Sequence, residues 1–175
     1  CERLWLLDND LLPHPDVFRL PQVEGDIVIA PYPWVGNFRP CFLNYVDLNA
    51  FSKGFKPVPP GPVVDVDGVG MGCTIIGRHV LEDKRMWRDP EWVTMDGKLE
   101  TLPADAAPPV FWESKKPNGA MEHGDDFNFC IRARRLGYRV RADVSIANGH
   151  YKSVDVKDAW RIVAEQLHIQ QEVAA

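Results

Sequence analysis

The chain has 175 residues, of which 45% are hydrophobic, which suffices for one globular domain with a buried core. Its formal net charge of −5 lacks the basic footprint of nucleic-acid-binding proteins, so we expect no nucleic acid among its partners. The four cysteines are widely spread and form no C-x-x-C pair, which argues against a structural zinc site and for reduced thiols in a cytoplasmic setting.

The amino-terminal segment predicts a buried strand that ends in two acids. Residues 4–7 form a short apolar run, typical of a strand covered on both faces in a parallel sheet. Asp8 and Asp10 follow at once, and an extended chain would place both carboxylates on one side. Ligands bind beyond the carboxyl ends of such strands, so a divalent cation is one interpretation. A plain turn is the other, because Asp and Asn favour turns.

The rest of the chain alternates between predicted strands and helices, which favours an α/β layer architecture. We expect strands within 26–30, 63–66, 73–76 and 138–144, and helices within 17–20, 78–89, 126–136 and 160–167. Gly137 is placed to cap the third helix. We expect one domain over residues 1–175, with 152–175 as a helical segment at its end.

Three further places carry candidate chemistry. The alternating glycines of 68–72 allow a close backbone approach to a ligand, although taken alone they favour a tight turn. Asp125 and Asp126 begin a predicted helix: one acid is enough to cap it, whereas two neighbouring carboxylates raise each other's pKa, as suits a general base. His150 follows a strand and is either structural or a third ligand for a metal held by carboxylates.

Taken in this order, the segments resemble the second half of a GT-A-fold glycosyltransferase of the large family-2 type. The resemblance is carried by the strand ending in Asp8-Asn9-Asp10, by 70–81, which is similar to the family's G-x-G-C-x-x-I-x-R-x-x-L run, and by 124–132, which is similar to its G-E-D-x-D-F-C-x-R helix start. His150 completes the series, which covers roughly residues 4–151. Asp125 stands where the family usually has Glu, and Asn128 where it usually has Asp.

The resemblance implies a role for each matching residue. Asp8, Asp10 and His150 would hold Mn²⁺ or Mg²⁺ on a nucleotide-diphospho-sugar donor. Asp126 would deprotonate the acceptor hydroxyl, giving inversion at the anomeric carbon, and Asp125 would line the acceptor site beside it. The remaining substrate-binding residues would be Gly70, Met71, Gly72, Cys73, Trp112 and Arg132. The acceptor would be a carbohydrate or another hydroxyl compound.

The resemblance also implies an incomplete fold. The family's amino-terminal βαβ unit, which grips the nucleotide, has no counterpart in this sequence. We therefore expect a GT-A-like mixed sheet flanked by helices, with residues 1–151 as its metal- and acceptor-binding part. A partner chain or an upstream segment would complete the sheet, and any association with a membrane would run through a part outside this chain.

Two other functions stay open on the sequence. One is a non-catalytic carbohydrate- or nucleotide-binding module that keeps the shape of these motifs. The other is a metal-dependent phosphotransferase or nucleotidyltransferase that uses the same acids. The aromatic residues within 32–38 and the pair at 111–112 could stack on a sugar ring or belong to an interface or core.

Overall fold

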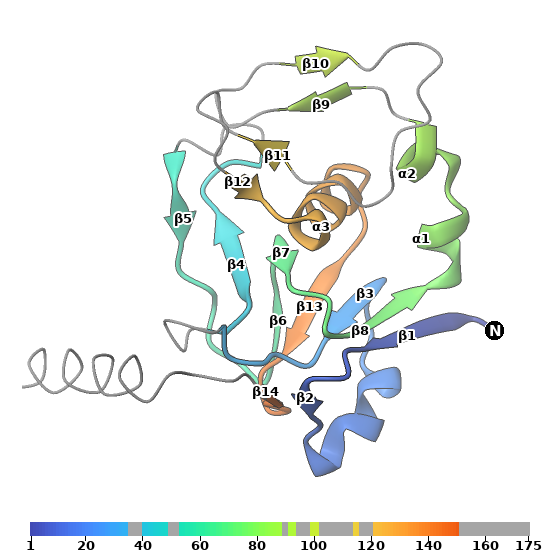
Figure 1. Ribbon diagram of the computed structural model, residues 1–175, viewed down its shortest axis with the longest axis vertical. Helices are drawn as coiled ribbons and strands as arrows, with labels where there is room; N and C mark the ends of the chain where they lie inside the picture. The colour runs from blue at the N-terminus through green and yellow to red at the C-terminus, as the bar shows by residue number, and fades with distance from the viewer. Residues whose placement is uncertain are drawn as a thin grey trace, which may run out of the picture.

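The computed structural model describes residues 1–34, 40–48, 53–88, 91–93, 99–101, 114–115 and 121–150. Their centre is a mixed five-stranded sheet flanked by helices, the α/β class that the sequence predicts (Figure 1). The strands in spatial order are β1 (Arg3–Leu7), β8 (Cys73–Gly77), β3 (Ile27–Ile29), β13 (Val140–Asp143) and β6 (Val63–Asp65). Within this sheet, β3 and β13 pair in parallel and the other pairs are antiparallel.

The central strands are buried on both faces. One buried cluster joins Ile27 and Ile29 of β3 to helix α3 (Asp125–Arg135). The other joins Val28 of the same strand to the 3-10 helix η1 (Pro15–Gln22). Since successive strand side chains point to opposite faces, a continuous apolar run covers both sides of the sheet at once.

The first strand differs from its prediction. β1 is an edge strand that pairs antiparallel with β8, and Leu4 and Leu7 are 44% and 49% exposed. The expectation of a parallel strand buried on both faces is therefore wrong. Among the described residues β8 is its one strand neighbour, so part of its apolar surface stays open.

The helix expected within 78–89 is two short helices, α1 (Arg78–Glu82) and α2 (Lys84–Arg88). The break lies at Asp83, whose backbone is extended. Its carboxylate accepts hydrogen bonds from the Arg85 guanidinium and from the Tyr138 hydroxyl at 2.6 Å. These bonds hold the turn against the start of the β13 segment and keep the pKa of Asp83 well below its usual range.

The helix expected within 126–136 is confirmed as α3, at Asp125–Arg135. It ends at Gly137, which has φ +94° and whose N–H donates to the Arg134 carbonyl. Only glycine adopts this left-handed conformation without strain, so the local sequence specifies where the helix ends.

Smaller sheets surround the central one. A three-stranded sheet has the order β5 (Phe55–Lys56), β4 (Phe42–Tyr45) and β7 (Gly68–Val69). Three two-stranded pairs are β2 (Leu11–Leu12) with β14 (Gly149–His150), β9 (Glu91–Val93) with β10 (Leu99–Thr101), and β11 (Ser114–Lys115) with β12 (Met121–His123). The segment 152–175 lies outside the described residues.

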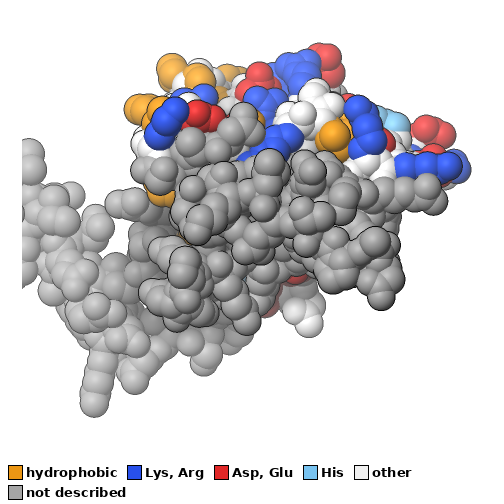
Figure 2. All heavy atoms as spheres, turned by 90° about the horizontal axis from the view of Figure 1, so that it is seen from above, with side chains coloured by type: hydrophobic (Ala, Val, Ile, Leu, Met, Phe, Trp, Pro, Cys, Tyr) orange, Lys and Arg blue, Asp and Glu red, His pale blue; other side chains and the backbone are white. Residues whose placement is uncertain are grey.

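The surface and the thiols add little about partners. All four cysteines are free. On the face shown in Figure 2, the described side chains mix basic, acidic and hydrophobic groups. No helix among the described residues is long and apolar enough to cross a membrane. The compartment and the absence of nucleic acid stay predictions.

Candidate functional site

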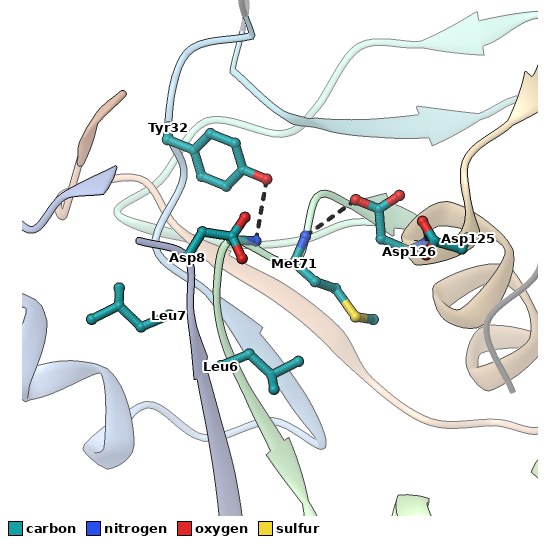
Figure 3. Close-up of a pocket in the computed structure, with 8 residues that line it drawn as sticks. Leu6, Leu7, Asp8, Tyr32, Met71, Asp125 and Asp126 are labelled. Carbon is teal, nitrogen blue, oxygen red and sulfur yellow. Dashed lines mark hydrogen bonds between the residues drawn. The ribbon is translucent and has the colours of Figure 1, made fainter. Parts of the chain in front are cut away.

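A cavity of about 410 Å³ lies between the end of β1 and the start of α3 (Figure 3). Its volume falls within the range of small-molecule sites. The residues that line it are Leu6, Leu7, Asp8, Tyr32, Met71, Gly72, Asp125 and Asp126. Five of these are acids or glycine-segment residues that the sequence singles out, and they come from three parts of the chain. The fold therefore brings the predicted motifs to one place.

Asp126 is a half-buried acid of this cavity. Its Oδ2 accepts a hydrogen bond from the Met71 N–H at 3.3 Å, and its Oδ1 accepts one from the Phe127 N–H at 3.0 Å. Burial raises its pKa, and the neighbouring charge of Asp125 raises it further, although both hydrogen bonds act in the opposite direction. A raised pKa makes this carboxylate a stronger base than an exposed aspartate, as suits a general base.

The acids at the start of α3 also bind N–H groups of its first turn, so capping and chemistry are not exclusive roles for them. Gly124 occupies the N-cap position, and its residue type provides no side-chain cap. Asp125 accepts the N–H of Asp126 at 3.0 Å, within the first turn. Both acids also lie at the positive end of the helix dipole, which favours their charged form.

Tyr32 closes the cavity on the side of the glycine segment. Its hydroxyl oxygen accepts a hydrogen bond from the Gly72 N–H at 3.2 Å (Figure 3). Burial, followed by the nearby Cys41 thiol, raises the pKa of this phenol, which therefore stays neutral. The sequence marked Tyr32 only as part of an aromatic loop. Nothing in the local pattern indicated that its hydroxyl would bond to the Gly72 N–H, next to the Met71 N–H that bonds to Asp126.

The glycines at 70 and 72 make room for this ring. A Cβ at Gly70 would lie 2.5 Å from the Tyr32 hydroxyl oxygen. A Cβ at Gly72 would lie 2.9 Å from the same ring and 2.9 Å from Asp8 Oδ2. Glycine at these two positions thus allows the backbone to pass close to the Tyr32 ring and, at Gly72, close to the Asp8 carboxylate.

This contact gives a prediction that needs no substrate. Gly70→Ala should destabilise the chain by about 1–3 kcal/mol through overpacking. Tyr32→Phe should cost about 1 kcal/mol through loss of the bond from Gly72. In the double variant, removal of the hydroxyl opens space for the new methyl group. Urea unfolding of all four proteins should therefore show a favourable coupling of about 1 kcal/mol. Strictly additive costs would contradict this packing.

The two acids after β1 diverge. The Leu11 N–H donates to the Asp8 carbonyl at 3.4 Å, which closes a turn, so the expectation of an extended Asp8–Asp10 segment is wrong. Asp8 lines the cavity beside Gly72. Asp10 lies instead beside His150, with 3.4 Å between Asp10 Oδ2 and His150 Nε2.

His150 is placed by pairing and by a buried anchor. β14 pairs with β2, which sets His150 opposite Leu11. Next to the strand, buried Asn148 donates to the Ala30 carbonyl at 3.0 Å and accepts from the His14 N–H at 2.9 Å. The His150 ring also packs edge-to-face on Tyr32, with centroids 5.1 Å apart. Strand pairing therefore brings together two residues at opposite ends of the described chain.

Asp10 and His150 bring one carboxylate and one imidazole together as two candidate metal ligands. His150 Nδ1 lies 3.0 Å from the Pro33 carbonyl, and the bond forms when Nδ1 carries the proton. In neutral histidine that tautomer leaves a lone pair on Nε2, which is the atom near the carboxylate. Two ligands at right angles around a metal, each at about 2.1 Å, lie about 3 Å apart. The observed 3.4 Å is close to that separation.

Within the part of the chain that the structure describes, these two candidate ligands have no close third. Among the described residues, no group of three or more His, Cys, Asp and Glu side chains is close enough to hold one ion. Mg²⁺ commonly takes one or two protein ligands and completes its shell with water and phosphate oxygens. Asp10 offers one carboxylate of that kind, His150 offers an imidazole nitrogen that suits transition metals better than Mg²⁺, and Asp8 does not join them as a third close ligand.

The other predicted site residues lie elsewhere. The Cys73 side chain is fully buried in the cluster under the sheet, and burial raises its pKa. Arg132 is buried on α3 and donates to the Met86 carbonyl at 2.6 Å, so it braces the α2 segment. Neither lines the cavity, and Gly70 contacts it only through Tyr32. Trp112 lies outside the described residues.

Comparison with known proteins adds no family. No protein-family model matches the chain, and no curated protein matches it. Among solved structures, the crystal structure of A197 from STIV is similar, with a TM-score of 0.47 and 17% sequence identity over 87% of this chain and 59% of that one. The chain thus spans less than two thirds of that protein, and we draw nothing about function from so distant a likeness.

Proposed function

We propose that the chain is the metal- and acceptor-binding part of an inverting, metal-dependent glycosyltransferase with a GT-A-like fold. The observation that carries this proposal is Asp126, a half-buried carboxyl with a raised pKa that lines a cavity together with Asp8. Desolvation of a carboxylate is costly, and carboxyls with raised pKa values in clefts are enriched at functional sites. Proton removal from an acceptor hydroxyl is a task that this position suits.

In this proposal the chain's residues divide the work. Asp126 accepts the proton of the acceptor hydroxyl, while Met71 and Phe127 hold its two oxygens in place. Asp10 and His150 would hold Mn²⁺ or Mg²⁺, which neutralises charge on the leaving nucleoside diphosphate. Tyr32 connects the Asp10–His150 pair to the cavity, because its ring contacts His150 and its hydroxyl accepts a hydrogen bond from the Gly72 N–H.

The donor nucleotide needs a further binding surface. The described lining of the cavity contains three acids and no Lys or Arg, so it offers little grip for a diphosphate by itself. β1 has an open edge beside this cavity among the described residues. Pairing of an upstream segment or a partner chain along that edge would extend the sheet next to Asp8. The proposal places the nucleotide-binding part there.

Product analysis tests the proposal against its two alternatives. The complete protein is incubated with UDP- and GDP-sugars and a panel of glycosides, with and without Mn²⁺. A glycosyltransferase releases a nucleoside diphosphate and lengthens the glycoside, and Asp126→Ala and Asp10→Ala both abolish this. Release of pyrophosphate would identify a nucleotidyltransferase. Metal-dependent donor binding without turnover would identify a non-catalytic module.

A further inference from the structure

Trp34 is a large aromatic side chain that stays 54% exposed. Its indole stacks on the Phe127 ring, with centroids 6.2 Å apart and planes inclined by 19°. Phe127 is itself buried and packs against Gly68, where a Cβ would lie 2.6 Å from the ring. The stack therefore rests on a firm base, and the exposed part of the indole is a flat, pre-positioned apolar surface.

Neither ring of this stack lines the cavity, but each belongs to a residue close in sequence to one that does. Phe127 follows Asp126 directly, and its N–H donates to the Asp126 carboxylate. Trp34 is two residues from Tyr32, which lines the cavity. Between them, the Pro33 carbonyl lies 3.0 Å from His150 Nδ1, which fixes the path of this loop. The Phe127 stack thus holds Trp34 against the first turn of α3, on a loop that is fixed at Pro33.

The chemistry beside Trp34 selects a class of ligand. The cavity offers carboxylates from Asp8, Asp125 and Asp126, and none of its described lining residues is a cation. Carboxylates accept hydrogen bonds from hydroxyl groups but repel anions. An aromatic face attracts the C–H groups of a ring through its negative quadrupole and removes apolar surface from water. A neutral pyranose has both features, namely hydroxyl donors at its edge and C–H groups on its faces.

We propose that Trp34, backed by Phe127, is the platform on which the pyranose ring of a neutral glycoside acceptor stacks. The acceptor ring lies on the indole and extends a hydroxyl toward Asp126. This inference rests on the proposed glycosyltransferase function for the identity of the ring as acceptor. Sugar binding by Trp34 is measurable without any transfer reaction.

The test is a titration of the full chain with methyl glycosides of glucose, galactose, mannose and N-acetylglucosamine. The Trp34 indole N–H signal is identified in a ¹H–¹⁵N spectrum by its loss in Trp34→Phe. We expect at least one glycoside to shift that signal. Trp34→Ala should weaken its binding about tenfold or more, whereas Trp34→Phe should keep most of the affinity because a ring remains.

Phe18→Ala is the matched control. Phe18 is 74% exposed and packs edge-to-face on Trp5, away from the cavity lining. Its replacement should leave glycoside affinity unchanged. The inference is overturned if no glycoside in the panel shifts the Trp34 signal, if Trp34→Ala binds as well as the parent chain, or if Phe18→Ala weakens binding equally.

The two proposals fail in different ways. If the complete protein transfers no sugar while Trp34-dependent glycoside binding persists, the transferase proposal fails and the platform stands as part of a binding module. If transfer occurs but Trp34→Ala leaves the acceptor KM unchanged, the platform fails and the transferase stands. Asp126→Asn should lower kcat far more than it changes the acceptor KM, the opposite of the split expected for Trp34→Ala.

Discussion

Replacement of Asp126 by Asn is expected to lower the rate of sugar transfer by the complete protein about a thousandfold. Asparagine has nearly the same shape and can still accept the Phe127 N–H, but it cannot take up a proton from the acceptor. The measurement is kcat with saturating donor and acceptor, alongside thermal unfolding to show that the variant is folded. A folded variant with parental kcat would remove Asp126 from the mechanism.

The pH dependence gives an independent check on this role. The rate should rise as pH passes upward through the Asp126 pKa, because a base works in its ionised form. Burial and the Asp125 charge both raise that pKa. Asp125→Asn should therefore move the rising limb of the profile to lower pH, but not to the position of an exposed aspartate. An unmoved limb would show that another group controls the rate.

The same pKa has a consequence for stability. The folded-state pKa of Asp126 is raised above its unfolded value, so the protonated carboxyl favours the folded chain. That contribution is fully present below the unfolded pKa and is lost as pH rises through the folded pKa. Asp126→Asn lacks this pH-dependent loss, which parallel denaturant curves at several pH values would reveal as a smaller decline in the free energy of unfolding.

Removal of either ligand at the Asp10–His150 pair is expected to weaken Mn²⁺ binding at least about tenfold to a hundredfold. Each variant, Asp10→Asn or His150→Ala, removes one of the two proposed metal ligands, which have no close third among the described residues. Electron paramagnetic resonance of free Mn²⁺ measures the affinity directly. EDTA treatment of the complete protein should likewise abolish transfer, and added Mn²⁺ should restore it.

Asp16→Asn is the control for this prediction. Asp16 belongs to η1 and its side chain is 53% exposed, so its loss changes the net charge without touching the pair. It should leave Mn²⁺ affinity unchanged. Equal weakening by all three substitutions would mean that the acids act only through the overall charge, and parental affinity in Asp10→Asn would make the metal assignment wrong.

Local sequence sufficed for the elements whose signals are local. α3 was predictable because an apolar face and Gly137 mark its course and its end. The central strands β3 and β8 were predictable as apolar runs because both of their faces are covered. The break at Asp83 was not predictable, since it depends on hydrogen bonds to Arg85 and Tyr138, and Tyr138 lies 55 residues away.

The apolar run of β1 shows where such patterns mislead. Residues 4–7 read like a central parallel strand, yet β1 is an antiparallel edge strand. The hydrophobicity of a strand indicates how much of its surface is favourably buried. It does not indicate which strand pairs with it. Direction and order in a sheet depend on pairings far apart in sequence, such as Leu7 with Cys73.

The sequence by itself determined which residue types are present for chemistry: two acids after a strand, two at a helix start, and alternating glycines that fit either a tight turn or a close approach. The tertiary structure alone decided their grouping. It placed Asp8 and Asp126 around one cavity and Asp10 beside His150. It also placed Tyr32 where it contacts both Gly72 and His150. The physical reason is that strand pairing and burial act between distant segments, whereas a sequence motif specifies only the positions near it.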